Sequence, residues 1–476
     1  MMPLSRTLRI LQKHTRIGDP HVTSDDVDRL SILYAIVEPL IRREPGGTYR
    51  PCLAARWSLS DDARTWTFQL REGVIFHDGK PFDAGDVVTS LTRIRDENVG
   101  GELGTTGVFQ SYLAGSTIEA AGSHTVMLTT SEPTADLLDL LVDIPILSKA
   151  GIERLPEGFV GTGPYECKAH SEARVLLTRH PRYWAPDDRP LVIDWMSVPD
   201  PQERLIRLLA GRADVAGALP PWARDALDAA SGIRLVRVQT SVCATFMGNL
   251  FEGLCTHRAA RQALNCALNI PDLIRTVAHD AALPLTGPLT AFHLGFDPET
   301  PGYSYDPKRA RALLDEAGFG PTLGLTLDVP TTLPDEALDL AEKMAEYYSD
   351  IGIETRIITH QNRPAYAERV RAKKIHDAAC FDSTPFSTFR VFREKFHSGL
   401  RGPWWLGYDN PRVNRLIDTA RATVAVSERQ GLYRQAYALL SEDAPWIFLY
   451  NPIRYLGARR DLGAWHPSPE GYLAFS

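Results

Sequence analysis

The sequence predicts a mixed α/β protein of about two or three domains. A chain of 476 residues, 44% of them hydrophobic and 23% charged, can bury more than one core. Period-two patterns typical of strands alternate with patterns at helical spacing along most of its length. Over residues 326–358 a strand pattern, a long helix pattern and a second strand pattern follow one another, which is typical of an alternating α/β unit.

The first predicted elements are a strand at residues 8–11 and a helix that follows it. Asp25 or Asp26 can cap this helix, because an aspartate side chain accepts hydrogen bonds from the unpaired amides of a first turn. The segment Glu38-Pro39-Leu40 ends it. The apolar side chains at helical spacing are Val27, Leu30, Leu33, Tyr34 and Val37.

A strand, a turn and a capped helix are predicted next, between residues 66 and 94. The strand alternates apolar and polar residues, the apolar ones being Trp66, Phe68 and Leu70. Asp78-Gly79 turns the chain, and Asp83 can cap a helix with Asp86 three residues later. The apolar face of that helix consists of Val87, Val88, Leu91 and Ile94.

The same two periodicities predict the remaining elements. Strands are expected at residues 125–129, 234–238, 326–329, 354–358 and 444–450. Helices are expected at residues 136–141, 258–269, 305–319, 335–350, 410–420 and 429–440.

Composition excludes several classes of protein. The net charge of −7 and the scattered basic residues argue against a nucleic-acid partner, which requires a concentrated basic surface. No segment reaches the roughly 18 apolar residues of a membrane helix. The first ten residues lack the long apolar core and the cleavage site of a secretory signal. The six cysteines are too sparse for a disulfide scaffold and are expected to be mostly buried thiols.

The segment between residues 53 and 87 contains four distinctive runs: Leu53-Ala54-Ala55-Arg56-Trp57, Thr65-Trp66-Thr67-Phe68, Leu70-Arg71-Glu72-Gly73-Val74 and Ile75-Phe76-His77-Asp78-Gly79-Lys80-Pro81-Phe82. These runs closely resemble the signature of the peptide/nickel class of ABC-transporter solute-binding proteins, extracellular solute-binding protein family 5. The resemblance extends over about residues 8–460, including Gly161-Thr162-Gly163-Pro164-Tyr165 and the helix at 258–269.

The resemblance implies an α/β, two-lobed periplasmic-binding-protein fold with an extra small domain and a ligand cleft between hinged lobes. The first lobe would comprise residues 1–45, 158–246 and 450–476, with Tyr183-Trp184 and Ile193-Asp194-Trp195 continuing its sheet. Residues 46–157 would form the extra domain and residues 247–449 the second lobe, with a hinge at Met247-Gly248-Asn249.

The function implied is that of the substrate-binding component of an ABC importer. Such a protein captures a small organic solute, closes over it and presents it to the permease. A peptide or peptide-like solute is expected first, and an opine-like anion or sugar conjugate second. The resemblance implies a monomer in the periplasm, without cofactor or enzymatic activity, although the sequence as given shows no signal peptide. Nickel-binding relatives make a metal ligand an alternative, but no metal site is expected because the histidines lack ligand spacing.

The most informative segment for the ligand runs from Asp377 to Arg390. In peptide-binding relatives a carboxylate here, shortly before an Asp-Pro pair, binds the ammonium group of the ligand. This sequence has Thr384-Pro385 instead. Counting back from the proline makes Asp382 the equivalent, whereas counting forward from Asp377 makes it Phe386, and both residues remain candidates.

An arginine–aromatic group follows this segment. Arginine binds carboxylate and phosphate, and flat aromatic rings stack on a ligand at low entropic cost, so an anionic or sugar-like solute would suit such side chains. Solvated helix faces and core packing are the competing explanations. The candidates are Arg390, Arg393, Arg401, Trp404 and Trp405.

Three further aromatic residues complete the expected ligand-binding set. Phe109 matches a segment that faces the cleft in oligopeptide-binding relatives, where a tyrosine stands nearby; core packing is the alternative. Phe246 and Tyr450 lie beside the two predicted crossings between the lobes. The loop from Asp19 to Asp25 commonly borders the ligand in the family.

Other chemistry finds little support. Gly161-Thr162-Gly163-Pro164-Tyr165 lacks the Gly-Lys-Ser/Thr that a phosphate loop needs. Neither His-Glu-x-x-His nor Gly-x-Ser-x-Gly occurs, and the 13 histidines lack ligand spacing. The alternative functions are a cytoplasmic ligand sensor and a hydrolase or lyase that evolved on the same fold.

Overall fold

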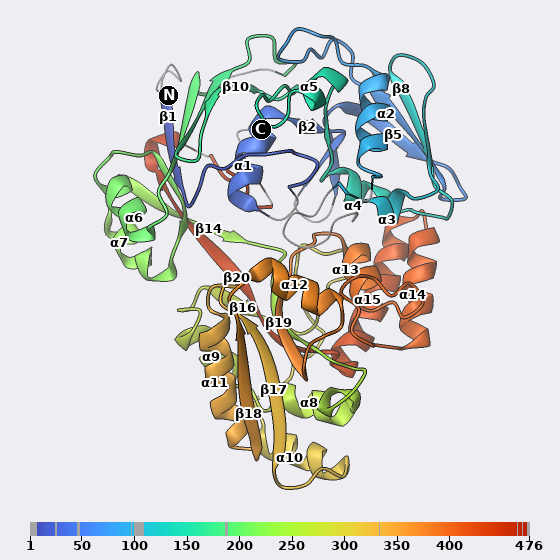
Figure 1. Cartoon of the computed structure of the whole chain (residues 1–476), viewed down its shortest axis with the longest axis vertical. Helices are drawn as coiled ribbons and strands as arrows, with labels where there is room; N and C mark the ends of the chain where they lie inside the picture. The colour runs from blue at the N-terminus through green and yellow to red at the C-terminus, as the bar shows by residue number, and fades with distance from the viewer. Residues whose placement is uncertain are drawn as a thin grey trace. The chain divides into compact units, whose positions relative to one another are not determined.

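The computed structural model describes residues 7–23, 26–44, 48–96, 98–99, 109–185, 189–332, 334–463, 465–468 and 470–473. The chain forms two compact units (Figure 1). Unit 1 comprises residues 1–238 and 454–476, and unit 2 comprises residues 239–453. The predicted cap at Asp25 lies outside the described residues, whereas Asp26 is described and caps the first helix.

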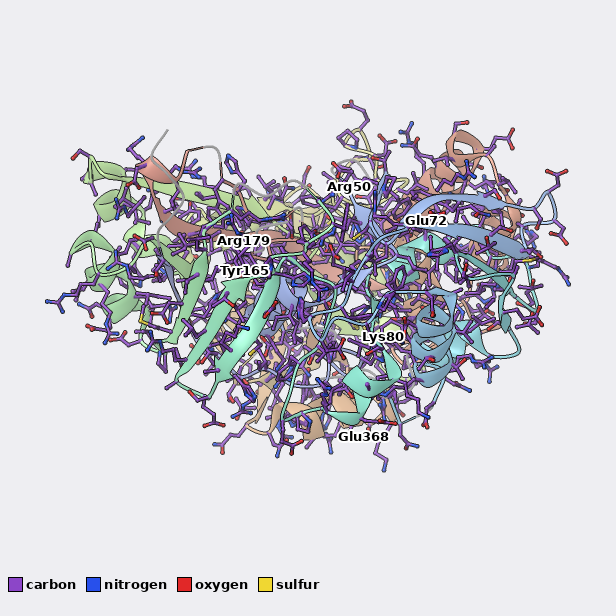
Figure 2. The ribbon with its side chains drawn as sticks, turned by 90° about the horizontal axis from the view of Figure 1, so that it is seen from above. Arg50, Glu72, Lys80, Tyr165, Arg179 and Glu368 are labelled. Carbon is purple, nitrogen blue, oxygen red and sulfur yellow. The ribbon has the colours of Figure 1, made fainter. Side chains whose placement is uncertain are left out.

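The main sheet of unit 1 has the strand order β10-β11-β12-β1-β13, followed by the second half of β20, with which β14 also pairs. Strand β1 runs parallel to β12 and β13, while β10, β11 and β12 form an antiparallel run. Tyr165 and Arg179, labelled in Figure 2, face each other on β10 and β11. The strands are β1 (Thr7–Gln12), β10 (Tyr165–His170), β11 (Arg174–Arg179), β12 (Val192–Ser197), β13 (Val215–Leu219), β14 (Ile233–Gln239) and β20 (Trp446–Arg459).

Helix α1 (Val27–Ile36) packs on this sheet because its apolar side chains recur at helical spacing. The Asp26 side chain accepts from the Arg29 amide and so caps the first turn. Ile32, Leu33 and Ile36 join Ile10 and Trp195 in the core. The other helices of this part are α5 (Lys149–Glu153), α6 (Pro201–Leu209) and α7 (Arg224–Ala229).

A four-stranded antiparallel sheet forms a second layer within unit 1, in the order β5-β6-β8-β7. Its strands are β5 (Ala54–Leu59), β6 (Thr65–Leu70), β7 (Thr117–Ala120) and β8 (Thr125–Thr129). Helix α2 (Ala84–Arg93) packs against it and begins with a capping box, in which Asp83 and Asp86 each accept from the other's amide. The predicted strand, turn and capped helix are therefore confirmed. Short elements connect the layers: β2 (Glu38–Pro39), β3 (Ile41–Arg43), β4 (Tyr49–Pro51), α3 (Gln110–Leu113), α4 (Leu137–Leu141) and β9 (Pro145–Ile146).

The loop Gly161–Tyr165 has a packing role in unit 1. A Cβ atom on Gly161 would lie 2.0 Å from the Ile36 carbonyl oxygen, and one on Gly163 would lie 2.6 Å from the Ile36 carbonyl carbon. His77 holds the loop, because its Nδ1 accepts from the Gly161 amide (3.3 Å) and its Nε2 donates to the Gly163 carbonyl (2.9 Å). The glycines thus allow two backbones to approach closely.

Tyr183-Trp184 does not continue the sheet, so that prediction is wrong, whereas β12 contains Ile193–Trp195 as predicted. The Tyr183 hydroxyl and the Trp184 indole instead donate to the buried carboxylate of Glu38, at 2.8 and 2.9 Å. A buried carboxylate requires such donors. Tyr183 and Trp184 supply them from the loop between β11 and β12.

Unit 2 contains a second sheet, in the order β20 (first half)-β15-β19-β17-β18, with β16 pairing on the other side of β20. Strands β17, β18 and β19 are parallel, while β15 is antiparallel to both of its neighbours. The predicted hinge residues Met247–Asn249 lie within unit 2, at the end of β15. The strands are β15 (Cys243–Gly248), β16 (Ala282–Pro284), β17 (Leu323–Pro330), β18 (Ile353–His360) and β19 (Ala378–Ser383).

The helices of unit 2 cover this sheet. The predicted apolar face of residues 258–269 is fully buried, and Gly318 ends the predicted helix at 305–319 in a left-handed conformation (φ +82°). The helices are α8 (Arg258–Cys266), α9 (Ile270–Thr276), α10 (Pro307–Glu316), α11 (Ala337–Ser349), α12 (Arg363–Arg371), α13 (Thr388–Lys395), α14 (Pro411–Ala422) and α15 (Val426–Asp443). None of the helices in the described residues is long and apolar enough to span a membrane. All six cysteines are free thiols, and four of them are buried.

Candidate functional site

The candidate site in unit 2 lies around the carboxyl end of β19. Strands β17, β18 and β19 run parallel, so their carboxyl ends point to the same edge of the sheet. In open α/β sheets ligands bind at this edge, because the strand-to-helix loops there carry exchangeable side chains. The segment predicted to decide the ligand, Asp377 to Arg390, runs through this edge into α13.

Asp382 and Tyr450 share one face of the sheet. Both are register partners of Ala244, which lies on β15 between them, and side chains of directly paired residues project to the same face. The Tyr450 hydroxyl donates to Glu336 at 3.2 Å. Burial and the neighbouring carboxylates Glu336 and Asp382 raise the pKa of Tyr450, so this hydroxyl stays protonated.

Glu336 is a residue that sequence reasoning missed. It stands at the N-cap position of α11, half-buried, beside Tyr450. No periodicity or motif distinguishes it, because only the pairing of distant strands brings β20 alongside this helix end. Its place in the first turn of the helix predicted at residues 335–350 is the sole signal in the sequence.

Phe386 lies in the loop that connects β19 to α13. Two contacts hold this loop against residues 292–293. His293 Nε2 lies 2.8 Å from the Pro385 carbonyl oxygen, and the Phe386 ring packs edge-on against Phe292 with 5.9 Å between the centroids. Ser387 caps α13 by accepting from the Arg390 amide. Both register candidates, Asp382 and Phe386, are therefore half-buried and lie four residues apart at the same strand end.

Arg390 and Arg393 lie on α13, and both are half-buried. The Arg390 guanidinium pairs with Glu394 at 3.2 Å, and the Glu394 side chain is only 4% exposed. A guanidinium carries a permanent charge and five N–H donors in a fixed fork, which suits carboxylate groups. The positive charge of both arginines therefore lies on one helix, α13.

The two tryptophans are packed against protein. The centroid of the Trp404 ring lies 4.6 Å from that of Phe381, and the Arg363 guanidinium lies 4.5 Å from the Phe381 centroid. Trp405 donates to the Tyr408 carbonyl at 2.6 Å, and the exposed Arg401 lies 5.4 Å from its ring. At 7% and 9% exposure, Trp404 and Trp405 present little free ring surface.

Phe246 and Phe109 are core residues in this structure. Phe246 is fully buried and pairs with Cys380 and Ile447 in the sheet of unit 2. Phe109 is 3% exposed and belongs to the core beneath the four-stranded sheet of unit 1. Their rings belong to these two apolar cores.

In unit 1 the loop between β1 and α1 is held rigidly. Asp19 accepts from the Arg93 guanidinium of α2 through both carboxylate oxygens. The His21 Nδ1 atom also accepts from Arg93 (2.9 Å), and its Nε2 donates to the Pro145 carbonyl (2.8 Å). Burial lowers the pKa of His21 to about 4, so the imidazole is neutral at pH 7.

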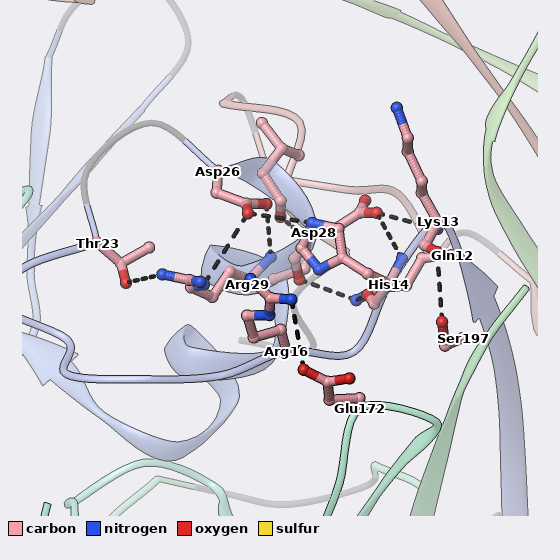
Figure 3. A network of polar contacts seen from close by, with 12 residues as sticks. Gln12, Lys13, His14, Arg16, Thr23, Asp26, Asp28, Arg29, Glu172 and Ser197 are labelled. Carbon is pink, nitrogen blue, oxygen red and sulfur yellow. Dashed lines mark hydrogen bonds and ion pairs between the residues drawn. The ribbon is translucent and has the colours of Figure 1, made fainter. Parts of the chain in front are cut away.

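A second polar network supports the same loop (Figure 3). The Asp28 carboxylate accepts from the Lys13 and His14 amides, while Gln12 donates to the main-chain oxygens of His14 and Asp28. His14 pairs with Asp26 at 3.1 Å, and this partner raises the pKa of His14 against the effect of burial. Contacts from α1 and α2 thus hold the described part of this loop, and its position beside the ligand stays a prediction.

A third polar group, in unit 2, is structural. The buried Asp328 carboxylate lies 2.7 Å from His360 Nε2 and 3.0 Å from His376 Nδ1, and it also accepts from the His376 amide. These contacts occupy the carboxylate on all sides. Among the described residues, no group of three or more His, Cys, Asp or Glu side chains could hold a metal ion.

A protein family and several known proteins resemble this chain over most of its length. The model of the family described as "Bacterial extracellular solute-binding proteins, family 5 Middle" matches residues 48–384. The chain is 27% identical to the probable di/tripeptide-binding protein 5 of Pseudomonas aeruginosa, over 90% of this chain and 87% of that protein. It is 28% identical to heme-binding protein A of Haemophilus influenzae, over 92% of this chain and 85% of that protein.

A solved structure shows the same fold. The PBP AgaA of A. tumefaciens R10, in complex with agropinic acid, superposes with a TM-score of 0.77 over 96% of this chain and 94% of that chain, at 20% identity.

Proposed function

Because this chain belongs to the bacterial extracellular solute-binding proteins of family 5, we propose that it captures a peptide or peptide-like solute for an ABC importer. It delivers the solute to the permease of that importer in the periplasm, as a monomer and without chemical change. The match to a di/tripeptide-binding relative over 90% of the chain supports the solute class.

The observation that carries this proposal is the pair of carboxylates beside Tyr450. Asp382 shares a sheet face with Tyr450, and Tyr450 donates to Glu336. A desolvated ammonium group needs a carboxylate partner, because burying an unpaired charge costs several kcal/mol. Asp382, with Glu336 behind it, is proposed to bind the ligand's ammonium.

The other candidate residues are proposed to have different roles according to how exposed their side chains are. Phe386 supplies an apolar surface beside Asp382, and Arg390 and Arg393 attract the carboxylate end of the solute. The more deeply buried residues of unit 2 support these groups rather than stacking on the solute. They are Phe246, Trp404, Trp405 and Tyr450, while the exposed Arg401 lies against Trp405. Phe109 is proposed to serve only the core of unit 1.

Binding of paired peptides to an Asp382→Asn variant tests the role of Asp382. A dipeptide with a free amino terminus should bind this variant about tenfold or more weakly than wild type, since a charge-assisted contact contributes about 1.5–3 kcal/mol. The N-acetylated form of the same dipeptide should bind both proteins equally. Isothermal titration of both peptides against both proteins measures the difference.

Asp350→Asn is the matched control, because Asp350 is an exposed carboxylate of the same unit, at the end of α11. It should bind both peptides as wild type does. Equal losses for free and acetylated dipeptides in Asp382→Asn would contradict the ammonium role. Failure of every peptide to bind the wild-type protein would contradict the proposed solute class.

An opine-like anion is the second candidate, favoured by Arg390 and Arg393. Two half-buried guanidinium groups one helical turn apart suit a solute with two carboxylates. The structural relative AgaA holds agropinic acid. A screen that pairs peptides with opines in thermal-shift measurements separates the two classes, since only a bound solute raises the melting temperature.

A further inference from the structure

Unit 1 contains a cavity of its own, of about 380 Å³, between the end of α1, strand β3 and the carboxyl-terminal segment. This volume falls within the range of about 300–1,000 Å³ typical of small-molecule sites. All of its lining residues belong to unit 1, whereas Asp382, Glu336 and Tyr450 belong to unit 2. One part of the wall is apolar, formed by Val142 and Pro39.

Tyr34 presents an unused hydroxyl to this cavity. Its side chain is buried, at 9% exposure, and its ring packs against Tyr472 at 5.1 Å. Among the described residues, the hydroxyl has no hydrogen-bonding partner. A buried phenol normally finds such a partner, so this hydroxyl marks a position where a polar atom of another molecule fits.

Two charged side chains on the same wall also have unused capacity. The Arg42 guanidinium donates from Nε to Cys52 and from Nη2 to Glu38, which leaves Nη1 without an acceptor among the described residues. The Glu470 carboxylate is 13% exposed, and its nearest cation is Arg43 Nε at 3.8 Å, beyond hydrogen-bond distance. The cavity thus offers both a donor and an acceptor.

The electrostatics of Tyr34 place these charges around its hydroxyl. Burial raises the pKa of Tyr34 well above its ordinary value, Asp143 and Glu470 raise it further, and Arg42 and Arg43 oppose them. Both signs of charge therefore act on one hydroxyl inside one cavity. A singly charged ligand would meet only one of the two groups, whereas a zwitterion meets both.

We infer that this cavity binds a free α-amino acid with an apolar side chain, at a site separate from that of the transported solute. The amino acid's carboxylate accepts from Arg42 Nη1 and the Tyr34 hydroxyl, its ammonium binds Glu470, and its side chain lies against Val142 and the tyrosine rings. Two donors bind the carboxylate of the ligand, and one carboxylate binds its ammonium. This arrangement selects zwitterions over simple anions or amines.

Titration of the purified full chain with L-leucine and L-phenylalanine tests the site. Ligand-detected NMR should show saturable binding in the millimolar range or tighter, and N-acetyl-leucine and leucinamide, which lack one charge each, should bind at least tenfold more weakly. Tyr34→Phe should weaken leucine binding about tenfold, since it removes a donor to a charged group. Glu470→Gln should do the same and serves as an independent variant.

Tyr305→Phe is the control, because Tyr305 is an exposed tyrosine of unit 2 at 42% exposure; its leucine binding should equal that of wild type. Absence of binding to the wild-type chain, or unchanged binding in both Tyr34→Phe and Glu470→Gln, would overturn the inference. Loss of leucine binding in Asp382→Asn would also overturn it, by assigning the amino acid to the solute site. Peptide titrations of Tyr34→Phe should match wild type, so the two proposals fail separately.

Discussion

At the scale of single residues, buried carboxylates organise unit 1. Glu38 is fully buried and accepts from the side chains of Arg42, Thr162, Tyr183 and Trp184. Three of these partners lie more than a hundred residues away in the chain. Such a group stabilises the fold only while every lone pair is occupied, so it fixes a unique arrangement of the segments that reach it.

Replacing Glu38 with Gln should lower the free energy of unfolding by about 3 kcal/mol, because it leaves Arg42 as a buried charge without its carboxylate. Urea denaturation at pH 7 measures the change. Glu316→Gln is the comparison, since Glu316 pairs with Arg309 on the surface, where the two side chains are 61% and 52% exposed. That change should cost less than about 1 kcal/mol. Similar losses in both variants would contradict a special role for Glu38.

The two buried histidines of unit 1 predict a pH dependence. Burial lowers the pKa values of His21 and His77 to about 4, from 6.5. Between pH 6.5 and pH 4 these two imidazoles are therefore protonated in the unfolded chain but neutral in the folded chain. The folded state is fully stable above pH 6.5 and loses stability as the pH falls through this range. Each group contributes about 3 kcal/mol.

Urea denaturation between pH 7.5 and pH 4.5 should show this fall. His77→Gln should be less stable than wild type at pH 7.5 and should lose less stability on acidification, because one of the two groups is gone. His257→Gln, which removes an exposed imidazole, should follow the wild-type profile. A flat wild-type profile across this range would show that the two imidazoles accept protons in the folded state.

At the scale of elements, features that depend on neighbouring residues could be predicted from the sequence. Features that depend on the pairing of distant segments could not. The caps at Asp26 and Asp83 were predicted because the capping side chain and its amide lie within three residues of each other. The two-residue strands β2 and β9 carry no periodicity and exist only because distant segments pair. Glu336 escaped prediction for the same reason, since the register of β20 brings Tyr450 to it.

The candidate site was predicted in part. The family resemblance predicted that the segment from Asp377 to Arg390 decides the ligand, but no strand was predicted there, and the structure has β19 within it, parallel to β17. Which of its side chains would be exposed was not predictable. Trp404 is buried against Phe381, a contact that depends on how the loop after α13 folds back on β19. The binding roles of Asp382 and Phe386 stay predictions.

Gly163→Ala tests whether the loop at 161–165 serves backbone packing. The added Cβ atom would lie 2.6 Å from the Ile36 carbonyl carbon, so α1 or the loop must shift. The free energy of unfolding should fall by about 2–3 kcal/mol. Gly232→Ala, where a Cβ atom meets nothing within 4 Å, is the control and should change it by less than about 0.5 kcal/mol. A neutral Gly163→Ala would contradict the close-approach explanation.

At the scale of the whole molecule, the predicted fold class is confirmed by the family match and by the similarity to solved binding proteins. The core of unit 2 contains Phe246, Leu327 and Tyr450, while unit 1 has separate cores around Trp195 and Phe68. Only two chain segments, at Val238–Gln239 and Ile453–Arg454, connect the units. Strand periodicity predicted some of the strands in each unit, but nothing local to these segments predicts where the division falls.

Because the units have separate cores and are joined by two chain segments, we expect two unfolding transitions in calorimetry of the protein without its solute. A solute held by both units should raise both transition temperatures, because it binds only when both are folded. At a hundred times its dissociation constant it adds about 2.7 kcal/mol. A free amino acid in the cavity of unit 1 should raise only one transition, because all of the residues proposed to bind it belong to that unit. If the transported solute likewise raised a single transition, capture by closure of the two units would be contradicted, since closure requires the solute to stabilise both.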